Sequence, residues 1–125
     1  MKTKRSILIV DDSPLIIERL SELLKELDHI DIIVNAGNYE DAIEMLTTKN
    51  IDTVLLDIHL PGKNGIALLK YIKAIYPDIK VIMLSNQATG FYRSICKNAG
   101  ASYFIDKSKE FESIPTIISS LDQRF

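Results

Sequence analysis

Four short apolar segments, each leading to polar side chains, constrain the fold of this chain more than any other feature of its sequence. Each segment is free of charge and rich in aliphatic or aromatic residues, which is typical of a strand buried on both faces of a parallel sheet. Polar groups at the ends of such strands meet at the carboxyl edge of the sheet, where ligands bind, so we expect them to form one pocket. The segments are Ile7 to Val10, Val54 to Leu56, Val81 to Leu84 and Tyr103 to Ile105, and the polar residues that follow are Asp11, Asp12, Asp57, Ser85 and Lys107.

Helical patterns alternate with the strand-like segments. Ser13 is a suitable N-cap and Pro14 suits the first helical position, so we expect the first helix to begin there. Pro115 is poorly tolerated deep inside a helix, which predicts that the last helix begins only near Ser113 or Ile114. The other expected elements are a weak strand at Asp31 to Val34, a helix from Asn38 to about Lys49, a helix after the loop that ends at Gly65, a helix from about Ala88 to Asn98, and a loop or short turn from Lys107 to Glu112.

Five strand–helix units with short connections predict an α/β fold with a doubly wound, five-stranded parallel sheet. With the strand order 2-1-3-4-5, the connections reverse direction between the first and third strands, and a ligand site is expected there. Asp11, Asp12 and Asp57 follow those two strands, so the topology and the acidic residues indicate the same place. The chain length fits one domain, residues 1–125, with a core from about residue 6 to residue 121.

Composition excludes several classes of function. The net charge of −2 leaves no basic surface for nucleic acid or for an anionic membrane. The sequence contains no run of about 20 apolar residues that could span a membrane. A single cysteine, Cys96, excludes an internal disulfide and fits a reducing compartment. We therefore expect a cytoplasmic protein that binds neither nucleic acid nor membrane.

The predicted pocket suits a divalent cation and a phosphoryl group. Clustered carboxylates repel one another and normally require a cation, and oxygen ligands favour Mg²⁺ or the similar Mn²⁺. Asp57 is the best candidate for a nucleophile, because carboxylates can attack phosphoryl groups to form aspartyl phosphates. Ser85 can donate a hydrogen bond to a phosphoryl oxygen, and Lys107 can neutralise first the carboxylate and then the phosphoryl group.

At these residues the chain resembles the receiver domains of two-component response regulators, from about Ser6 to Leu121. Any one of the matching motifs is weak, but all four in order and at domain-wide spacing are specific. The motifs are Ile-Leu-Ile-Val-Asp11-Asp12-Ser-Pro, Leu-Leu-Asp57-Ile-His-Leu-Pro-Gly-Lys-Asn-Gly65, Ile-Met-Leu-Ser85 and Gly-Ala-Ser-Tyr-Phe104-Ile-Asp-Lys107.

The resemblance implies a flavodoxin-like receiver fold and a role for each matching residue. The metal would be held by Asp11, Asp12, the phosphorylated Asp57 and the backbone carbonyl of His59. Ser85 and Lys107 would sense the phosphoryl group, and the Phe104 ring would change position with Ser85. Such a protein is a signalling phosphoacceptor that assists its own phosphorylation and dephosphorylation, rather than an enzyme.

Three residues depart from the common pattern of the family. Ser108 follows Lys107 where many receivers have proline in a cis bond, and a cis bond before serine would cost about 3–4 kcal/mol. We therefore favour a trans Lys107–Ser108 bond and a different loop. Gln87 stands where a carboxylate or alanine is often found, and His59 stands two residues past the nucleophile. Both could modulate dephosphorylation, but His59 is more often an exposed loop residue.

Two other classes of protein fit the sequence less well than the receiver does. An aspartate-nucleophile phosphatase would need a second acid two residues past the nucleophile, where this chain has His59. A flavin- or nucleotide-binding module would need glycines or hydroxyls after the first strand, where Asp11 and Asp12 would repel a phosphate.

These motifs do not identify the signalling pathway or the protein that receives the signal. The expected phosphodonor is a histidine kinase or a histidine phosphotransfer protein, and the downstream partner is a protein that the sequence does not identify. The chain length favours a single-domain regulator similar to chemotaxis or phosphorelay receivers, and the alternative is the receiver of a longer DNA-binding regulator. We expect a monomer or a phosphorylation-dependent dimer that uses the face formed by residues 88–122, which we call the switch face.

Overall fold

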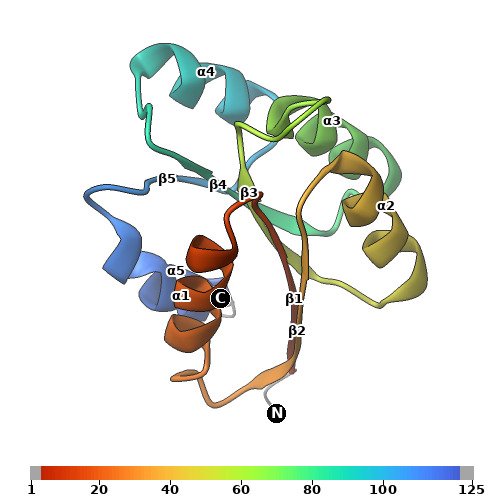
Figure 1. Ribbon diagram of the computed structural model, residues 1–125, viewed down its shortest axis with the longest axis vertical. Helices are drawn as coiled ribbons and strands as arrows, with labels where there is room; N and C mark the ends of the chain where they lie inside the picture. The colour runs from red at the N-terminus through yellow and green to blue at the C-terminus, as the bar shows by residue number, and fades with distance from the viewer. Residues whose placement is uncertain (1–3, 122–125) are drawn as a thin grey trace.

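A computed structural model describes residues 4–121 of the chain, so both ends of the expected 1–125 domain lie outside the described residues. Its centre is a five-stranded parallel sheet in the order β2-β1-β3-β4-β5, which confirms the predicted topology (Figure 1). The strands are β1 (Arg5–Val10), β2 (Ile30–Ala36), β3 (Thr53–Asp57), β4 (Lys80–Ser85) and β5 (Tyr103–Asp106).

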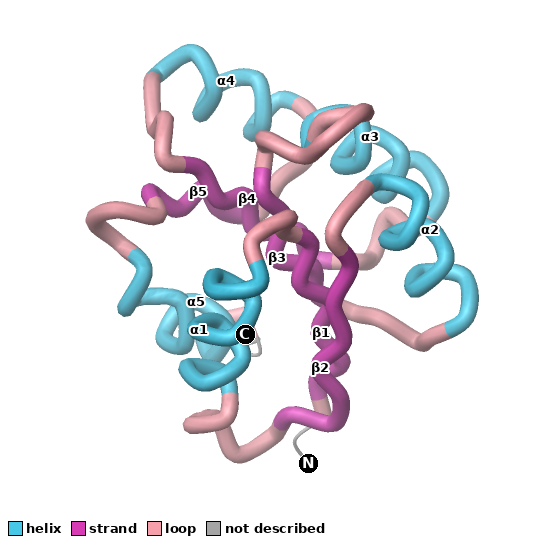
Figure 2. Tube along the Cα trace, in the orientation of Figure 1, coloured by secondary structure: helices cyan, strands magenta, loops and turns pink. Residues whose placement is uncertain are grey.

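Helices cover both faces of the sheet. Figures 1 and 2 show α1 and α5 on one face, and α2, α3 and α4 on the other. The helices are α1 (Pro14–Leu24), α2 (Tyr39–Thr48), α3 (Gly65–Ile75), α4 (Gly90–Asn98) and α5 (Ile114–Ser120), and a short 3₁₀ helix, η1 (Phe111–Ser113), precedes α5. Among residues 4–121, no helix combines the length and the apolar character that a membrane span requires.

Local sequence signals account for where the helices begin. The side chains of Ser13 and Asn38 each accept a hydrogen bond from the backbone N–H three residues further on, as N-caps do. The α5 helix begins at Ile114, as Pro115 predicts. The α4 helix begins at Gly90, two residues later than expected, because the hydroxyl of Thr89 caps it by accepting from the Tyr92 N–H.

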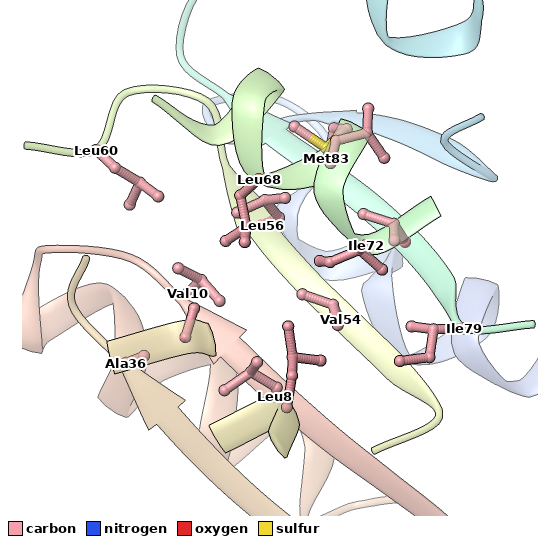
Figure 3. Packing of buried hydrophobic residues seen from close by; sticks show 14 of the residues in the cluster. Leu8, Val10, Ala36, Val54, Leu56, Leu60, Leu68, Ile72, Ile79 and Met83 are labelled. Atoms are coloured by element: carbon pink, nitrogen blue, oxygen red, sulfur yellow. The ribbon is translucent and has the colours of Figure 1, made fainter. Parts of the chain in front are cut away.

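The core consists of two apolar layers, one on each face of the sheet. Alternate residues of β1 point to opposite faces, so Leu8 joins one layer and Ile7 joins the other. Figure 3 shows the layer beneath α2 and α3, where Leu8, Val54 and Leu56 from the strands meet Leu68 and Ile72 from α3.

The prediction that all four apolar segments are buried on both faces is wrong for the last one. β5 is an edge strand, and its Tyr103 is 40% exposed while Phe104 is only half-buried. The central strands β1 and β3 are buried along their whole length. The edge of the sheet at β5 therefore has less tertiary packing than its centre.

Gly65 brings the start of α3 directly against the end of β3. A Cβ atom at Gly65 would overlap the backbone carbonyl of Asp57, and the Gly65 N–H donates to the Ile58 carbonyl at 2.7 Å. Only glycine permits this approach, which fixes the backbone at Asp57 through contact with a helix.

Replacing Gly65 with alanine should therefore lower the free energy of unfolding by about 1–3 kcal/mol, the usual cost of overpacking. A matched control is Gly90→Ala, because an added Cβ at Gly90 has no atom within 4 Å among the described residues. Urea unfolding of both variants measures the difference. Equal stability of the two variants would show that the β3–α3 contact relaxes without cost.

Candidate functional site

Three carboxylates meet at the carboxyl edge of the sheet, between β1 and β3. Asp11 follows β1, Asp57 ends β3, and these two are buried while Asp12 is exposed. One oxygen from each of the three lies within 4.8 Å of the others, and we call these residues the carboxylate cluster. Hard divalent cations such as Mg²⁺ bind through oxygen ligands, so the donor set fits such an ion, with the exposed Asp12 on the solvent side.

Backbone N–H groups orient the two buried carboxylates. Oδ1 of Asp11 accepts from the Ser13 N–H at 2.9 Å, and Oδ1 of Asp57 accepts from the His59 N–H at 3.2 Å. Each bond is made by the loop that leaves the strand end. The second oxygen of each carboxylate faces Lys107.

Lys107 is the cation that faces the two buried carboxylates. Its Nζ lies 2.7 Å from Oδ2 of Asp11 and 3.4 Å from Oδ2 of Asp57. The Lys107 side chain is only 8% exposed, and that of Asp11 is 1% exposed. The sequence predicts that Lys107 neutralises Asp57, whereas the structure gives its shorter contact to Asp11. The cluster has three carboxylates and Lys107 contacts two of them, so it keeps an excess of negative charge that a divalent cation would neutralise.

The pKa of Asp57 is raised above its ordinary value. Burial is the largest cause, because it disfavours the charged form, and the nearby charge of Asp11 acts in the same direction. The ammonium of Lys107 and the His59 N–H oppose the shift without cancelling it. The site therefore makes ionisation of Asp57 more costly than it is in water.

Ser85 ends β4 and is fully buried at the same edge. Its Oγ accepts from the Gln87 N–H at 2.9 Å, and its carbonyl accepts from the Lys107 N–H at 2.9 Å. The backbone of Ser85 is thus bonded directly to the backbone of Lys107. A displacement of either residue must affect the other.

The side chains of His59 and Gln87 are both exposed on loops that border the carboxylate cluster. The His59 ring meets the ring of Tyr92, on α4, edge to face with 5.7 Å between their centres. Tyr92 lies within the switch face, but the sequence does not reveal this contact, because it joins residues on separate elements.

The family described as "Response regulator receiver domain" matches residues 7–119, which is most of the chain. The chain belongs to this family. The match confirms the resemblance seen in the four motifs, and it covers each residue of the carboxylate cluster as well as Ser85, Phe104 and Lys107.

Relatives of this receiver include regulators of known name. The Fimbriae Z protein of Salmonella typhimurium is 35% identical over 109 residues, which cover 87% of this receiver and 52% of that protein. The transcriptional regulatory protein MalR of Bacillus subtilis is 32% identical over 114 residues, which cover 91% of this receiver and 48% of that protein. The chain thus spans about half the length of these relatives.

Solved receiver structures have the same fold. The signal receiver domain of a DNA-binding response regulator from Colwellia psychrerythraea has a TM-score of 0.87 at 28% identity, covering 94% of this receiver and 98% of that chain. The isolated receiver domain of RcsB from Salmonella enterica, with the phosphomimetic BeF₃⁻, has a TM-score of 0.89 at 20% identity. The match covers 95% of this receiver and 88% of that chain. The RcsB likeness is one of fold alone.

The loop after Lys107 differs from the cis-proline form that is common in the family. Residues 4–121 contain no cis peptide bond, so the Lys107–Ser108 bond is trans, as expected. Oδ1 of Asp106 accepts hydrogen bonds from both the hydroxyl and the N–H of Ser108, at 2.6 and 2.9 Å, and these bonds lower the pKa of Asp106. Proline at position 108 could form neither bond, so serine gives this receiver another way to order the loop.

Arg93 and Glu110 are two further residues that the sequence analysis did not single out. They form an ion pair of 3.4 Å between α4 and the loop after β5. The contact joins positions 17 residues apart on different elements, so no local pattern could reveal it.

The raised pKa of Asp57 predicts that Asp57→Asn is more stable than the wild type in metal-free buffer near neutral pH. The folded-state pKa lies above the ordinary value of 3.8, so the ionised carboxylate destabilises the fold. As the pH rises, this destabilisation begins near the ordinary pKa of an aspartate and reaches its full size above the folded-state pKa of Asp57. The stability advantage of the variant should therefore be smallest near about pH 3 and grow as the pH is raised from there toward about pH 7.

Urea unfolding with a chelator, repeated across this pH range, measures the advantage. Saturating Mg²⁺ is the control, because a bound cation would favour the wild type and reduce the difference. An advantage that does not change with pH would contradict the assigned cost of burying Asp57.

Proposed function

We propose that this receiver accepts a phosphoryl group on Asp57 from a phosphohistidine, carried by a histidine kinase or a histidine phosphotransfer protein. The observation that carries the proposal is a buried aspartate within reach of two further carboxylates and of a buried lysine. In the transfer, a carboxylate oxygen of Asp57 forms a bond to phosphorus as the P–N bond breaks. The bonding electrons return to the imidazole of the donor.

The proposed cation is Mg²⁺ or Mn²⁺, held by Asp11, Asp12, Asp57 and the backbone carbonyl of His59. When bound, it would neutralise the carboxylate cluster and a phosphoryl oxygen, so that an anionic donor could approach. Lys107 then needs to move little, because its Nζ already lies 3.4 Å from Asp57. Ser85 would donate its hydroxyl hydrogen to a phosphoryl oxygen, and its Oγ can still accept from the Gln87 N–H.

The proposed output is a change of contacts on the switch face, of which residues 88–121 are described. Ser85 and Lys107 would move toward the phosphoryl group, and Phe104 would follow because β5 pairs with β4 along this edge. The face would then bind a partner protein, an output domain of the same polypeptide, or a second copy in a phosphorylation-dependent dimer. We place these events in the cytoplasm, where two-component phosphorelays operate.

The decisive experiment is phosphorylation by a small acyl phosphate with Mg²⁺, followed by mass spectrometry. The wild type should gain one phosphoryl group, located on Asp57, and chelation of the metal should abolish the gain. Asp57→Asn should remain unlabelled, while Asp41→Asn, which removes an exposed carboxylate on α2, should be labelled normally. Labelling of Asp57→Asn at the wild-type level would overturn the assignment.

A second prediction concerns the lifetime of the phosphorylated form. His59 and Gln87 border the pocket with exposed side chains, so each can affect the approach of water to the phosphoryl group. We expect alanine at either position to change the rate of dephosphorylation severalfold, with normal unfolding curves. Lys49→Ala, at the far end of α2, is the control. If both variants lose the phosphoryl group at the wild-type rate, these side chains have no part in hydrolysis.

A further inference from the structure

Arg93 makes three contacts that join separate parts of the switch face. Its guanidinium carbon lies 5.0 Å from the centre of the Phe104 ring, in a cation–π contact. One of its terminal nitrogens donates to the Phe104 carbonyl at 3.5 Å, and the other lies 3.4 Å from Oε1 of Glu110. A single side chain of α4 therefore contacts both β5 and the loop that follows it.

Glu110 connects this contact to the strand end that carries Lys107. The same oxygen, Oε1, accepts from the Asp106 N–H at 3.0 Å, and the Glu110 N–H donates to the Asp106 carbonyl at 2.8 Å. Asp106 ends β5 and precedes Lys107. Arg93, Glu110 and Asp106 thus form one continuous path from α4 to the residue next to the proposed phosphoryl sensor.

Arg93 lies on the solvent side of Phe104. Its side chain is 43% exposed, whereas the Phe104 ring is half-buried and packs against the core layer beneath it. The cation–π contact forms only while the ring keeps this outer position. An inward movement of the ring, as proposed for the response to Ser85, would separate it from Arg93.

We infer that Arg93 is a positioning residue that holds Phe104 outward and so opposes switching of the receiver. The inference rests on the proposed function, because it assumes that phosphorylation of Asp57 moves the Phe104 ring inward. The phosphoryl group must then overcome the Arg93 contacts before the switch face can rearrange. Loss of those contacts would shift the equilibrium toward the inward state without any phosphoryl group.

The expected size of the shift is modest, because the contacts are partly exposed. The Glu110 side chain is 44% exposed, so its pair with Arg93 is screened by water, and the cation–π contact adds a further small contribution. Together they correspond to a change of about three- to tenfold in the ratio of outward to inward Phe104. A shift of that size would tune the response without locking the domain in either state.

The test compares Arg93→Gln, which removes the charge, with Arg93→Lys, which keeps the charge but loses the flat surface that stacks on the ring. Glu110→Gln weakens the Arg93–Glu110 ion pair by removing the charge of the carboxylate. This variant tests the role of Arg93 if neither Arg93 variant folds. Lys97→Gln is the matched control, because Lys97 lies one turn further along α4 and lines the same cavity of about 340 Å³ beside Phe104.

The readout is the NMR signal of the Phe104 ring, recorded with and without beryllofluoride and with no phosphodonor. In Arg93→Gln the signal of the free protein should move toward that of the beryllofluoride-bound wild type. The movement should correspond to a change of about three- to tenfold in the ratio of outward to inward Phe104. Arg93→Lys should lie between Arg93→Gln and the wild type, and Lys97→Gln should match the wild type. The phosphorylation rate of Asp57 should rise in the same order.

The outcomes separate this inference from the proposed function. If beryllofluoride does not change the wild-type signal and Asp57 is not labelled, the proposed function fails. If the wild type switches but the Phe104 signals of Arg93→Gln and Glu110→Gln coincide with those of the wild type, the positioning role of Arg93 is overturned. A shift away from the beryllofluoride position, or an equal shift in Lys97→Gln, would also overturn it.

Discussion

The buried contact of Lys107 with Asp11 and Asp57 is the interaction on which the carboxyl edge of the sheet depends. It joins residues 96 positions apart in the chain and connects the end of β5 with the ends of β1 and β3. Burial makes each charge costly, so removing the ammonium would leave two carboxylates without compensation. The same arrangement fits the proposed cation and phosphoryl group, because the carboxylate cluster keeps an excess of negative charge at this edge of the sheet.

The sheet explains why so few residues suffice to build this site. Parallel pairing brings the ends of β1, β3, β4 and β5 to one edge, and each strand contributes a polar side chain there or one to two residues beyond it. The apolar layers on both faces hold the strands in register, so the positions of Asp11 and Asp57 follow from core packing. Gly65 adds a backbone contact that a side chain would prevent. Changes that disturb the core are thus expected to disturb the site as well.

The sequence predicted those features that depend on local patterns or on strand order. Ser13, Asn38 and Pro115 mark helix starts through their own chemistry, and three of the four charge-free segments correspond to the central strands β1, β3 and β4. The sequence did not predict that Lys107 lies closer to Asp11 than to Asp57, because side-chain torsions at a crowded site depend on every neighbour. It also missed the exposure of Tyr103 and the contacts of Arg93, since both depend on how α4 packs beside an edge strand.

The distribution of packing within the fold indicates where a change of state costs least. Around Asp57 the strands are fully buried, and a movement there would break close core contacts. At β5 only Ile105 is buried, and Arg93 and Glu110 contact this edge through side chains that are partly exposed to water. Ser85 and Lys107 link the two regions through a backbone hydrogen bond. The proposed displacement at the buried carboxylates would therefore reach β5 through this hydrogen bond, and α4 through the contacts of Arg93 with Phe104 and Glu110.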